Sequence, residues 1–203
     1  VLAKLPDAPP GTKGISLFLV PKYVTQADGS LGKDRNLLCT GLEKKMGIKG
    51  SATCQMTFEN STGYIIGEKH DGMRQMFTFM NTARVGTAIQ GTAHAELAFQ
   101  NALSYARERM SMRSLAGTKE PDSIADKIIP HPNVRHNVLL GKIVSEAGRL
   151  FVMDLARMLD ILESDKVSAA EKKAVDAEIG FLTPIAKGCL TELGLEAANA
   201  AVQ

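Results

Sequence analysis

The amino-acid sequence predicts an α+β protein, in which a fragment of β-sheet precedes most of an up-down four-helix bundle. Two observations carry this prediction. Over residues 1–68, short apolar runs are bounded by turn residues, and one stretch alternates apolar with polar side chains. From residue 71 onward, apolar side chains recur at helical spacing along three long segments. We therefore expect a β part at 1–68 and a helical part at 69–203.

The strands of the β part are predicted from short local patterns. Residues 15–20 form an apolar run that a proline closes, and Ala-Asp-Gly-Ser at 27–30 is a turn signal. Cys54, Met56 and Phe58 alternate with polar side chains, which predicts a half-buried strand with these three on its inner face. Strands are expected within 15–20, 36–47, 53–59 and 64–66, and loop over residues 1–12.

The first helix is predicted from Asp71, a candidate N-cap, to about Met110. Between Ala83 and Ala98, nine of the sixteen residues are Ala, Gly or Thr. Small side chains let another group approach the helix backbone closely. The sequence leaves open whether that group is another helix or a thin ligand.

Residues 113–132 contain prolines and no clear period, and they are long for a connection between helices, where ~2–8 residues are usual. We expect this connection to be ordered, because Ile124, Ile128 and Ile129 require burial. We also expect it to lie close to a nucleotide site, since it follows directly on a group of arginines.

Two further helices complete the predicted bundle. Pro132 suits the first position of a helix, and an unbroken apolar stripe follows it as far as Leu162. Ser168 with Glu171 forms a capping box for the last helix. Three long segments, joined by connections of a length that suits antiparallel neighbours, are typical of an up-down bundle.

Composition excludes several classes of function. The 24 basic and 22 acidic residues nearly balance, at a net charge of +2, which argues against a nucleic-acid partner. No apolar run approaches the ~20 residues of a membrane span. The 3 cysteines form no CxxC pair and the 4 histidines form no HxxxH pattern, so we expect no metal site and a cytoplasmic location.

Both ends of the sequence suggest a piece of a longer protein. Residue 1 is Val rather than Met, and helical character continues to Gln203 without a Gly or Pro stop signal. Residues that would complete a site are therefore expected outside these 203 residues.

Arginines are the candidate binding residues. Arg107, Arg109 and Arg113 lie within seven residues at the predicted end of the first helix. They either offset the negative end of the helix dipole or bind a phosphate through bidentate guanidinium groups. Arg84 lies inside the small-residue stretch, where it either pairs with a carboxylate of the bundle or contacts a ligand.

The sequence also resembles the acyl-CoA dehydrogenase family over nearly its whole length, in matching order and spacing. Residues 119–135 resemble a longer subgroup of this family that includes 3-methylmercaptopropionyl-CoA dehydrogenases. The matching stretches are KKMGIKGS at 44–51, FEN at 58–60 and IGE at 66–68, the helix from Gly72 to YARER at 105–109, and AANAAVQ at 197–203.

The resemblance implies a partial β-barrel, with residues 1–68 as the end of a middle β-domain and 69–203 as a truncated C-terminal helical bundle. It implies FAD as cofactor, an acyl-CoA substrate, an electron-transfer flavoprotein as partner, and a homodimer or homotetramer. The implied reaction is α,β-dehydrogenation of the thioester, in which a carboxylate removes the α-proton and the flavin takes up hydride.

Roles for individual residues follow from the resemblance alone. Arg109, Ser111 and Gln203 match positions that contact FAD, and Arg109 would bind the pyrophosphate of a neighbouring subunit's flavin. Arg84 and Asn81 match positions that face the CoA thioester. The glutamate base of the family is expected beyond Gln203, so no catalytic residue is assigned here. Two alternatives remain, an acyl-CoA oxidase-like enzyme and a helical scaffold that has lost catalysis.

Overall fold

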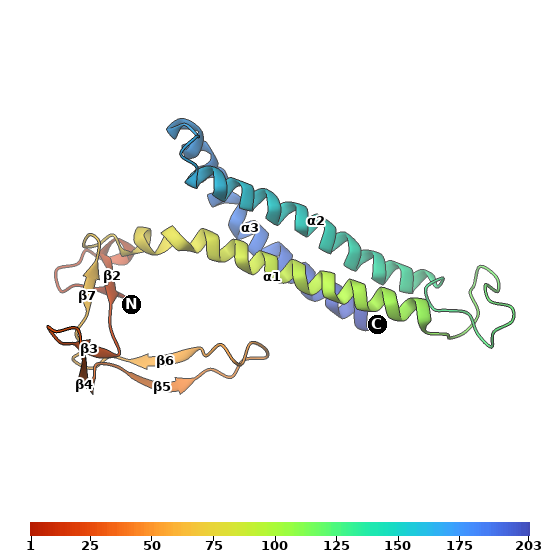
Figure 1. The fold of residues 1–203 in the computed structure, drawn as a ribbon, viewed down its shortest axis with the longest axis horizontal. Helices are drawn as coiled ribbons and strands as arrows, with labels where there is room; N and C mark the ends of the chain where they lie inside the picture. The colour runs from red at the N-terminus through yellow and green to blue at the C-terminus, as the bar shows by residue number, and fades with distance from the viewer. The chain divides into compact units, whose positions relative to one another are not determined.

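The computed structural model describes residues 1–203 in two compact units, Val1–Thr78 and Phe79–Gln203. The first unit holds seven short strands, and the second holds most of three long helices (Figure 1). The change from strand to helix comes at Gly72, where α1 begins. The predicted α+β class is thus confirmed.

The strands form three small antiparallel sheets and no closed barrel. The largest sheet has the order β1-β2-β7, in which Leu17 of β2 lies opposite both Leu2 and Ile66. The other two sheets are the hairpins β3-β4 and β5-β6. The strands are β1 (Leu2–Lys4), β2 (Ile15–Leu19), β3 (Tyr23–Thr25), β4 (Leu31–Arg35), β5 (Leu38–Leu42), β6 (Cys54–Thr57) and β7 (Tyr64–Ile66).

Each of the four predicted stretches contains a strand, but β1, β3 and β4 were not predicted. The expectation of a loop over residues 1–12 is wrong, because β1 pairs with β2 along its whole length. β1 shows no alternating pattern, since all three of its residues are exposed. Its pairing is with a strand more than ten residues away, which no local pattern reveals.

The predicted half-buried face of β6 is also wrong. Cys54, Met56 and Phe58 are all exposed, the last two to 41% and 42%. The strand pairs only with β5 in a two-stranded sheet. Without a second layer over this face, the apolar side chains stay at the surface.

The start of α1 (Gly72–Glu108) is fixed against β2 by a buried serine. Ser16 is fully buried, and its hydroxyl accepts a hydrogen bond of 2.8 Å from the backbone N–H of His70. A Cβ at Gly72 would lie 2.5 Å from the Ser16 carbonyl carbon, so only glycine fits there. The Asp71 carboxylate, a candidate N-cap, accepts instead from the Arg74 guanidinium.

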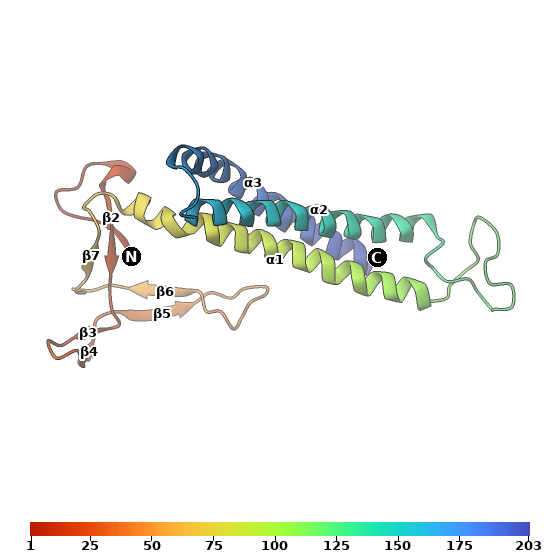
Figure 2. The same cartoon turned by 45° about the horizontal axis from the view of Figure 1, so that its top comes forward.

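The other two helices, α2 (Pro132–Glu163) and α3 (Ala169–Val202), begin as the sequence predicts. Pro132 is the first residue of α2, and the Ser168 hydroxyl caps α3 by accepting from the Glu171 N–H at 3.2 Å. The three helices lie side by side (Figure 2). None of them combines the length and the apolarity that crossing a membrane requires.

The helices pack closely because each carries a small residue at its contact with another. A Cβ at Gly194 of α3 would lie 2.5 Å from the Gly91 carbonyl oxygen of α1, and one at Gly148 of α2 would lie 2.8 Å from the Thr92 hydroxyl. The small-residue stretch of α1 therefore serves tight helix packing. The buried core around these contacts includes Val85, Ala88, Ala95, Val144, Leu155, Met158, Ile179, Ala186, Leu190 and Ala197.

This contact predicts opposite effects for two glycine substitutions in α3. Gly194→Ala should destabilise the protein by roughly 1–3 kcal/mol, because the new methyl group overpacks the contact with α1. Gly188→Ala is the matched control, since nothing lies within 4 Å of its Cβ position. It should stabilise by roughly 0.8–1 kcal/mol through helix propensity. Denaturant unfolding of the full-length protein measures both, and equal stabilities of the two variants would contradict the glycine contact.

Candidate functional site

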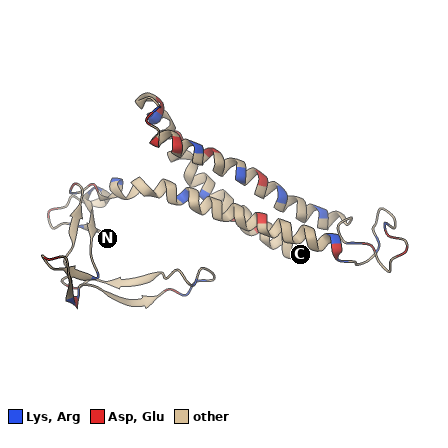
Figure 3. Cartoon of the chain, viewed as in Figure 1, with Lys and Arg blue, Asp and Glu red and all other residues tan.

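The predicted binding residues lie near opposite ends of α1. Arg84 and Asn81 belong to its first half, whereas Arg109 follows its last residue. Twenty-five residues separate Arg84 from Arg109, which is about 37 Å at ~1.5 Å per helical residue. Between the two ends α1 is almost uncharged, since Glu96 is the one Asp, Glu, Lys or Arg between Arg84 and Arg107 (Figure 3). The predicted residues therefore form two separate sites.

At the first of these sites, the structure brings Asn81 and Arg84 together. The Arg84 Nη1 donates to the Asn81 Oδ1 at 3.4 Å. The same oxygen accepts from the hydroxyl of Thr183 in α3 at 3.2 Å. Thr183 is fully buried, so the bond ties the Asn81 amide to the neighbouring helix. Sequence reasoning missed Thr183 because it lies about a hundred residues further along the chain.

At the second site, hydrogen bonds hold the backbone that follows α1. The Arg109 N–H donates to the Tyr105 carbonyl at 2.8 Å, and the Arg109 carbonyl accepts from the Ile128 N–H at 2.9 Å. The carbonyl of Ser111 lies 3.2 Å from the Nε2 of His131. The Arg109 side chain remains exposed and Ser111 is half-buried, so both stay accessible on a fixed backbone.

The three arginines at this end have different roles. Arg107 and Arg109 are exposed. Arg113 is exposed as well, but it reaches back into the connection, where its Nη1 donates to the Glu120 carbonyl at 2.9 Å and its Nη2 donates to the Ser123 carbonyl. It holds the connection together, which leaves two of the three arginines for a ligand.

A buried carboxylate organises this connection. The Asp126 side chain is fully buried and accepts from the backbone N–H groups of Ser114 at 2.8 Å, Lys119 at 2.9 Å and Glu120 at 2.7 Å. The Ser114 bond is the main cause that lowers its pKa to about 2, against the opposing effect of desolvation. The other two N–H groups and the Arg113 guanidinium, whose Nη1 lies 3.4 Å from Oδ1, lower the pKa further.

The apolar part of the prediction for 113–132 is wrong in one residue. Ile128 and Ile129 are half-buried, but Ile124 is 96% exposed. The connection folds around a hydrogen-bonded carboxylate instead of an apolar core, so Ile124 has no interior to enter. Nothing in the local sequence distinguishes Asp126 from a surface acid, which is why sequence reasoning missed it.

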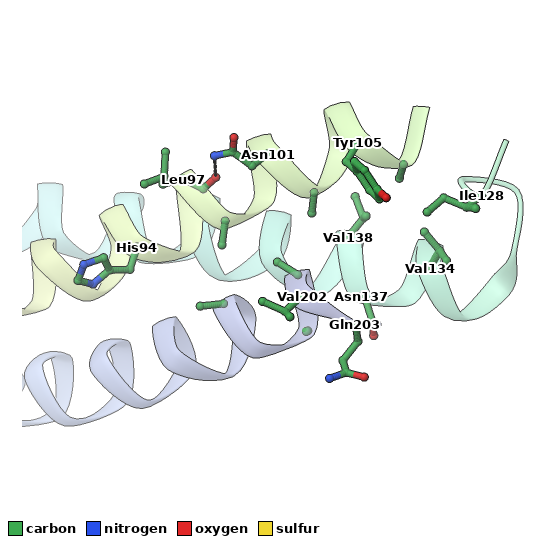
Figure 4. A pocket seen from close by; sticks show the side chains of 16 residues that line it. His94, Leu97, Asn101, Tyr105, Ile128, Val134, Asn137, Val138, Val202 and Gln203 are labelled. Carbon is green, nitrogen blue, oxygen red and sulfur yellow. Dashed lines mark hydrogen bonds between the residues drawn. The ribbon is translucent and has the colours of Figure 1, made fainter. Parts of the chain in front are cut away.

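An apolar groove of about 570 Å³ runs along the same end of the bundle (Figure 4). Gln203 borders it at the end of α3, together with Tyr105 of α1 and Asn137 of α2. Ile128, whose N–H holds the Arg109 carbonyl, also lines it. The structure therefore places Gln203 at the same end of the helical unit as Arg109 and Ser111. The other lining residues are His94, Leu97, Ala98, Asn101, Ala102, Ala106, Val134, Val138, Ala198, Ala200, Ala201 and Val202.

Comparison with known proteins identifies a family for the helical part of the chain. The model of the acyl-CoA dehydrogenase C-terminal domain matches residues 70–203. A 3-methylmercaptopropionyl-CoA dehydrogenase of Ruegeria pomeroyi is 40% identical over 100% of this chain and 34% of its own length. A butyryl-CoA dehydrogenase of Syntrophomonas wolfei is 36% identical, again over 100% of this chain and 34% of its own.

A solved structure agrees with these relatives at the level of the fold. It is an acyl-CoA dehydrogenase of Bacillus anthracis complexed with FAD. It matches with a TM-score of 0.63 and 22% identity, over 100% of this chain and 31% of that one. The chain thus spans about a third of the length of the curated relatives it matches.

The lowered pKa of Asp126 predicts an acid-sensitive connection. A carboxyl group whose pKa falls on folding stabilises the folded form above its unfolded pKa of 3.8, and this contribution is lost as the pH falls towards about 2. Unfolding midpoints between pH 5 and pH 2 should therefore fall more steeply for the native protein than for Asp126→Asn. Asp122→Asn, in the same connection, should keep the native slope. Equal slopes for all three proteins would contradict the role of Asp126.

Proposed function

The chain belongs to the acyl-CoA dehydrogenase family, and we propose that it is part of a longer FAD-dependent enzyme that dehydrogenates the α,β bond of an acyl-CoA thioester. The observation that carries the proposal is the family match over residues 70–203, which includes both arginine sites. Residues 1–68 would be the end of the middle β-domain of that enzyme, and 69–203 most of its C-terminal helical bundle. Because the relatives are about three times as long, the activity is proposed for the longer protein.

The residues at the end of α1 fit the pyrophosphate of FAD. A helix C-terminus repels an anion through its dipole, so a phosphate there requires guanidinium groups. Arg109 is exposed on a fixed backbone, and the Ser111 hydroxyl lies two residues further on. Gln203, at the same end of the bundle, would contact another part of the nucleotide. The bound flavin would accept the hydride of the reaction.

The separation of the two sites favours an oligomer. At ~37 Å apart, Arg84 and Arg109 would not contact the same part of one bound ligand, and the family resemblance assigns Arg109 to the flavin of a neighbouring subunit. One subunit would therefore use Arg84 at its own thioester site and Arg109 at the flavin of a neighbour. A homodimer is sufficient for this exchange, and a homotetramer of two such dimers is compatible with it.

The substrate-facing residues would bind and orient the thioester. Arg84 supplies a cation and Asn81 an amide, and Thr183 fixes the rotamer of Asn81 through its hydroxyl. A carboxylate outside these 203 residues would take the α-proton. The three exposed free cysteines are compatible with a reducing cytoplasm.

Anaerobic titration of the purified longer protein tests the function. If the proposal is correct, the protein is yellow, and 3-methylmercaptopropionyl-CoA or butyryl-CoA bleaches its flavin absorbance. Reoxidation by electron-transfer flavoprotein but not by oxygen identifies a dehydrogenase, and fast reoxidation by oxygen identifies an oxidase. A colourless protein that no acyl-CoA changes would be a scaffold without catalysis.

Arg109→Ala should weaken FAD binding far more than Arg107→Ala does. Both arginines are exposed at the end of α1, so the pair separates a specific contact from general positive charge. Loss of the charge-assisted bond should cost about 1.5–3 kcal/mol, or roughly 10–150-fold in the dissociation constant. Fluorescence titration of the deflavinated protein with FAD measures both dissociation constants. Equal losses of FAD affinity in the two variants would mean that only the general positive charge of this region matters.

Arg84→Ala should raise KM for acyl-CoA while FAD affinity stays unchanged. Thr183 still holds the Asn81 amide in this variant, so the fold of the bundle should survive. Arg84→Lys keeps the charge but loses the planar guanidinium group. Its KM for acyl-CoA should therefore lie between those of the wild type and Arg84→Ala. Steady-state kinetics with thermal unfolding separates this result from a structural role, in which the melting temperature would fall and KM would not change.

A further inference from the structure

We propose that Asp126 is a positioning residue, which fixes the backbone of residues 109–112 in the conformation that binds FAD. The inference rests on the function proposed above. The proposed function gives Asp126 no role, and the residue lies fourteen positions beyond Met112, in the connection that follows this segment. Three features of the structure support it.

The first feature is a reciprocal pair of backbone bonds. The Ser111 N–H donates to the Asp126 carbonyl at 2.9 Å, and the Asp126 N–H donates to the Met112 carbonyl at 2.8 Å. Met110 also forms an isolated antiparallel bridge with Lys127. The segment that carries Arg109 and Ser111 is thus one edge of a short ribbon. Asp126 belongs to the opposite edge, where both its N–H and its carbonyl form bonds across the ribbon.

The second feature is an unfavourable backbone conformation in the same segment. Met112 has a φ of +61°, in the left-handed region that a side chain like methionine rarely adopts. Its own side chain does not secure it, because it is 74% exposed. The Asp126 N–H donates to the Met112 carbonyl and so helps to hold this turn.

The third feature is that the Asp126 side chain couples this ribbon to the rest of the connection. Its carboxylate collects N–H groups from residues 114–120 and meets the Arg113 guanidinium, so the same residue binds the turn on both sides of Met112. Oδ1 alone accepts from two backbone N–H groups and from Arg113. An amide at this position offers only one acceptor atom, and its NH₂ group would face donors.

Asp126→Asn in the full-length FAD enzyme tests the inference, with Asp122→Asn as the matched control. We expect the dissociation constant of FAD for the deflavinated protein to rise at least tenfold in Asp126→Asn and to stay within twofold in the control. Amide hydrogen exchange at Ser111, Ser114, Lys119 and Glu120 of the apoprotein should accelerate at least tenfold. KM for acyl-CoA at saturating FAD should stay within twofold, because the thioester site is ~37 Å away.

Other results would overturn the inference. Fast exchange with unchanged FAD affinity would make Asp126 a purely structural residue of the connection, and a parallel rise in KM for acyl-CoA would indicate general loosening of the bundle. If Asp126→Asn does not fold, Arg113→Gln replaces it, since it removes the charge partner and leaves the carboxylate. That variant should raise the FAD dissociation constant at least threefold, and no change would refute the inference. A wild-type protein that binds no FAD would instead refute the proposed function.

Discussion

The backbone contact of α1 with α3 at Gly91 and Gly194 sets the geometry on which both candidate sites depend. With no side chain between the two helices, their backbones approach to ordinary van der Waals distance. That approach brings Thr183 of α3 within hydrogen-bond distance of Asn81, and it brings Gln203 to the groove beside the end of α1. A larger distance between α1 and α3 would separate Thr183 from Asn81 and Gln203 from the end of α1. Both candidate sites therefore depend on the packing of small residues between these helices.

Helix length is the second constraint. The 37 residues of α1 hold Arg84 and the segment that carries Arg109 at a fixed separation. Under the proposed function, a rigid helix of this length would let one subunit contribute to two reaction centres. The middle of α1 is nearly uncharged because it packs against α2 and α3, so the candidate binding residues lie only towards its two ends.

The elements with strong local signals were predictable, and those with distant partners were not. Pro132 and Ser168 mark helix starts through local backbone chemistry, and both starts are confirmed. The expected loop over residues 1–12 was wrong because β1 forms by pairing with β2. The expected half-buried face of β6 was wrong because no second layer covers that two-stranded sheet. At the sites, sequence reasoning named Arg84 and Arg109 but missed the two residues that orient their neighbours, Thr183 and Asp126. Thr183 lies about a hundred residues from Asn81, and Asp126 binds backbone groups 6 to 15 residues before it, so local composition reveals neither contact.

In the connection between α1 and α2, the Asp126 carboxylate binds the backbone N–H groups of Ser114, Lys119 and Glu120, and the residues between Ser114 and Lys119 form a short tip. Residues 115–118 lie between two of the N–H groups that the carboxylate accepts, and Leu115 is 86% exposed there. A Cβ at Gly117, which has a φ of +92°, would meet nothing within 4 Å, so this part of the tip faces open space. Changes in the length of this tip therefore leave the carboxylate and its partners in place. Homologous chains could gain or lose residues at 115–118 without disturbing the fold, and a peptide tag or fluorophore inserted there would report from the protein surface.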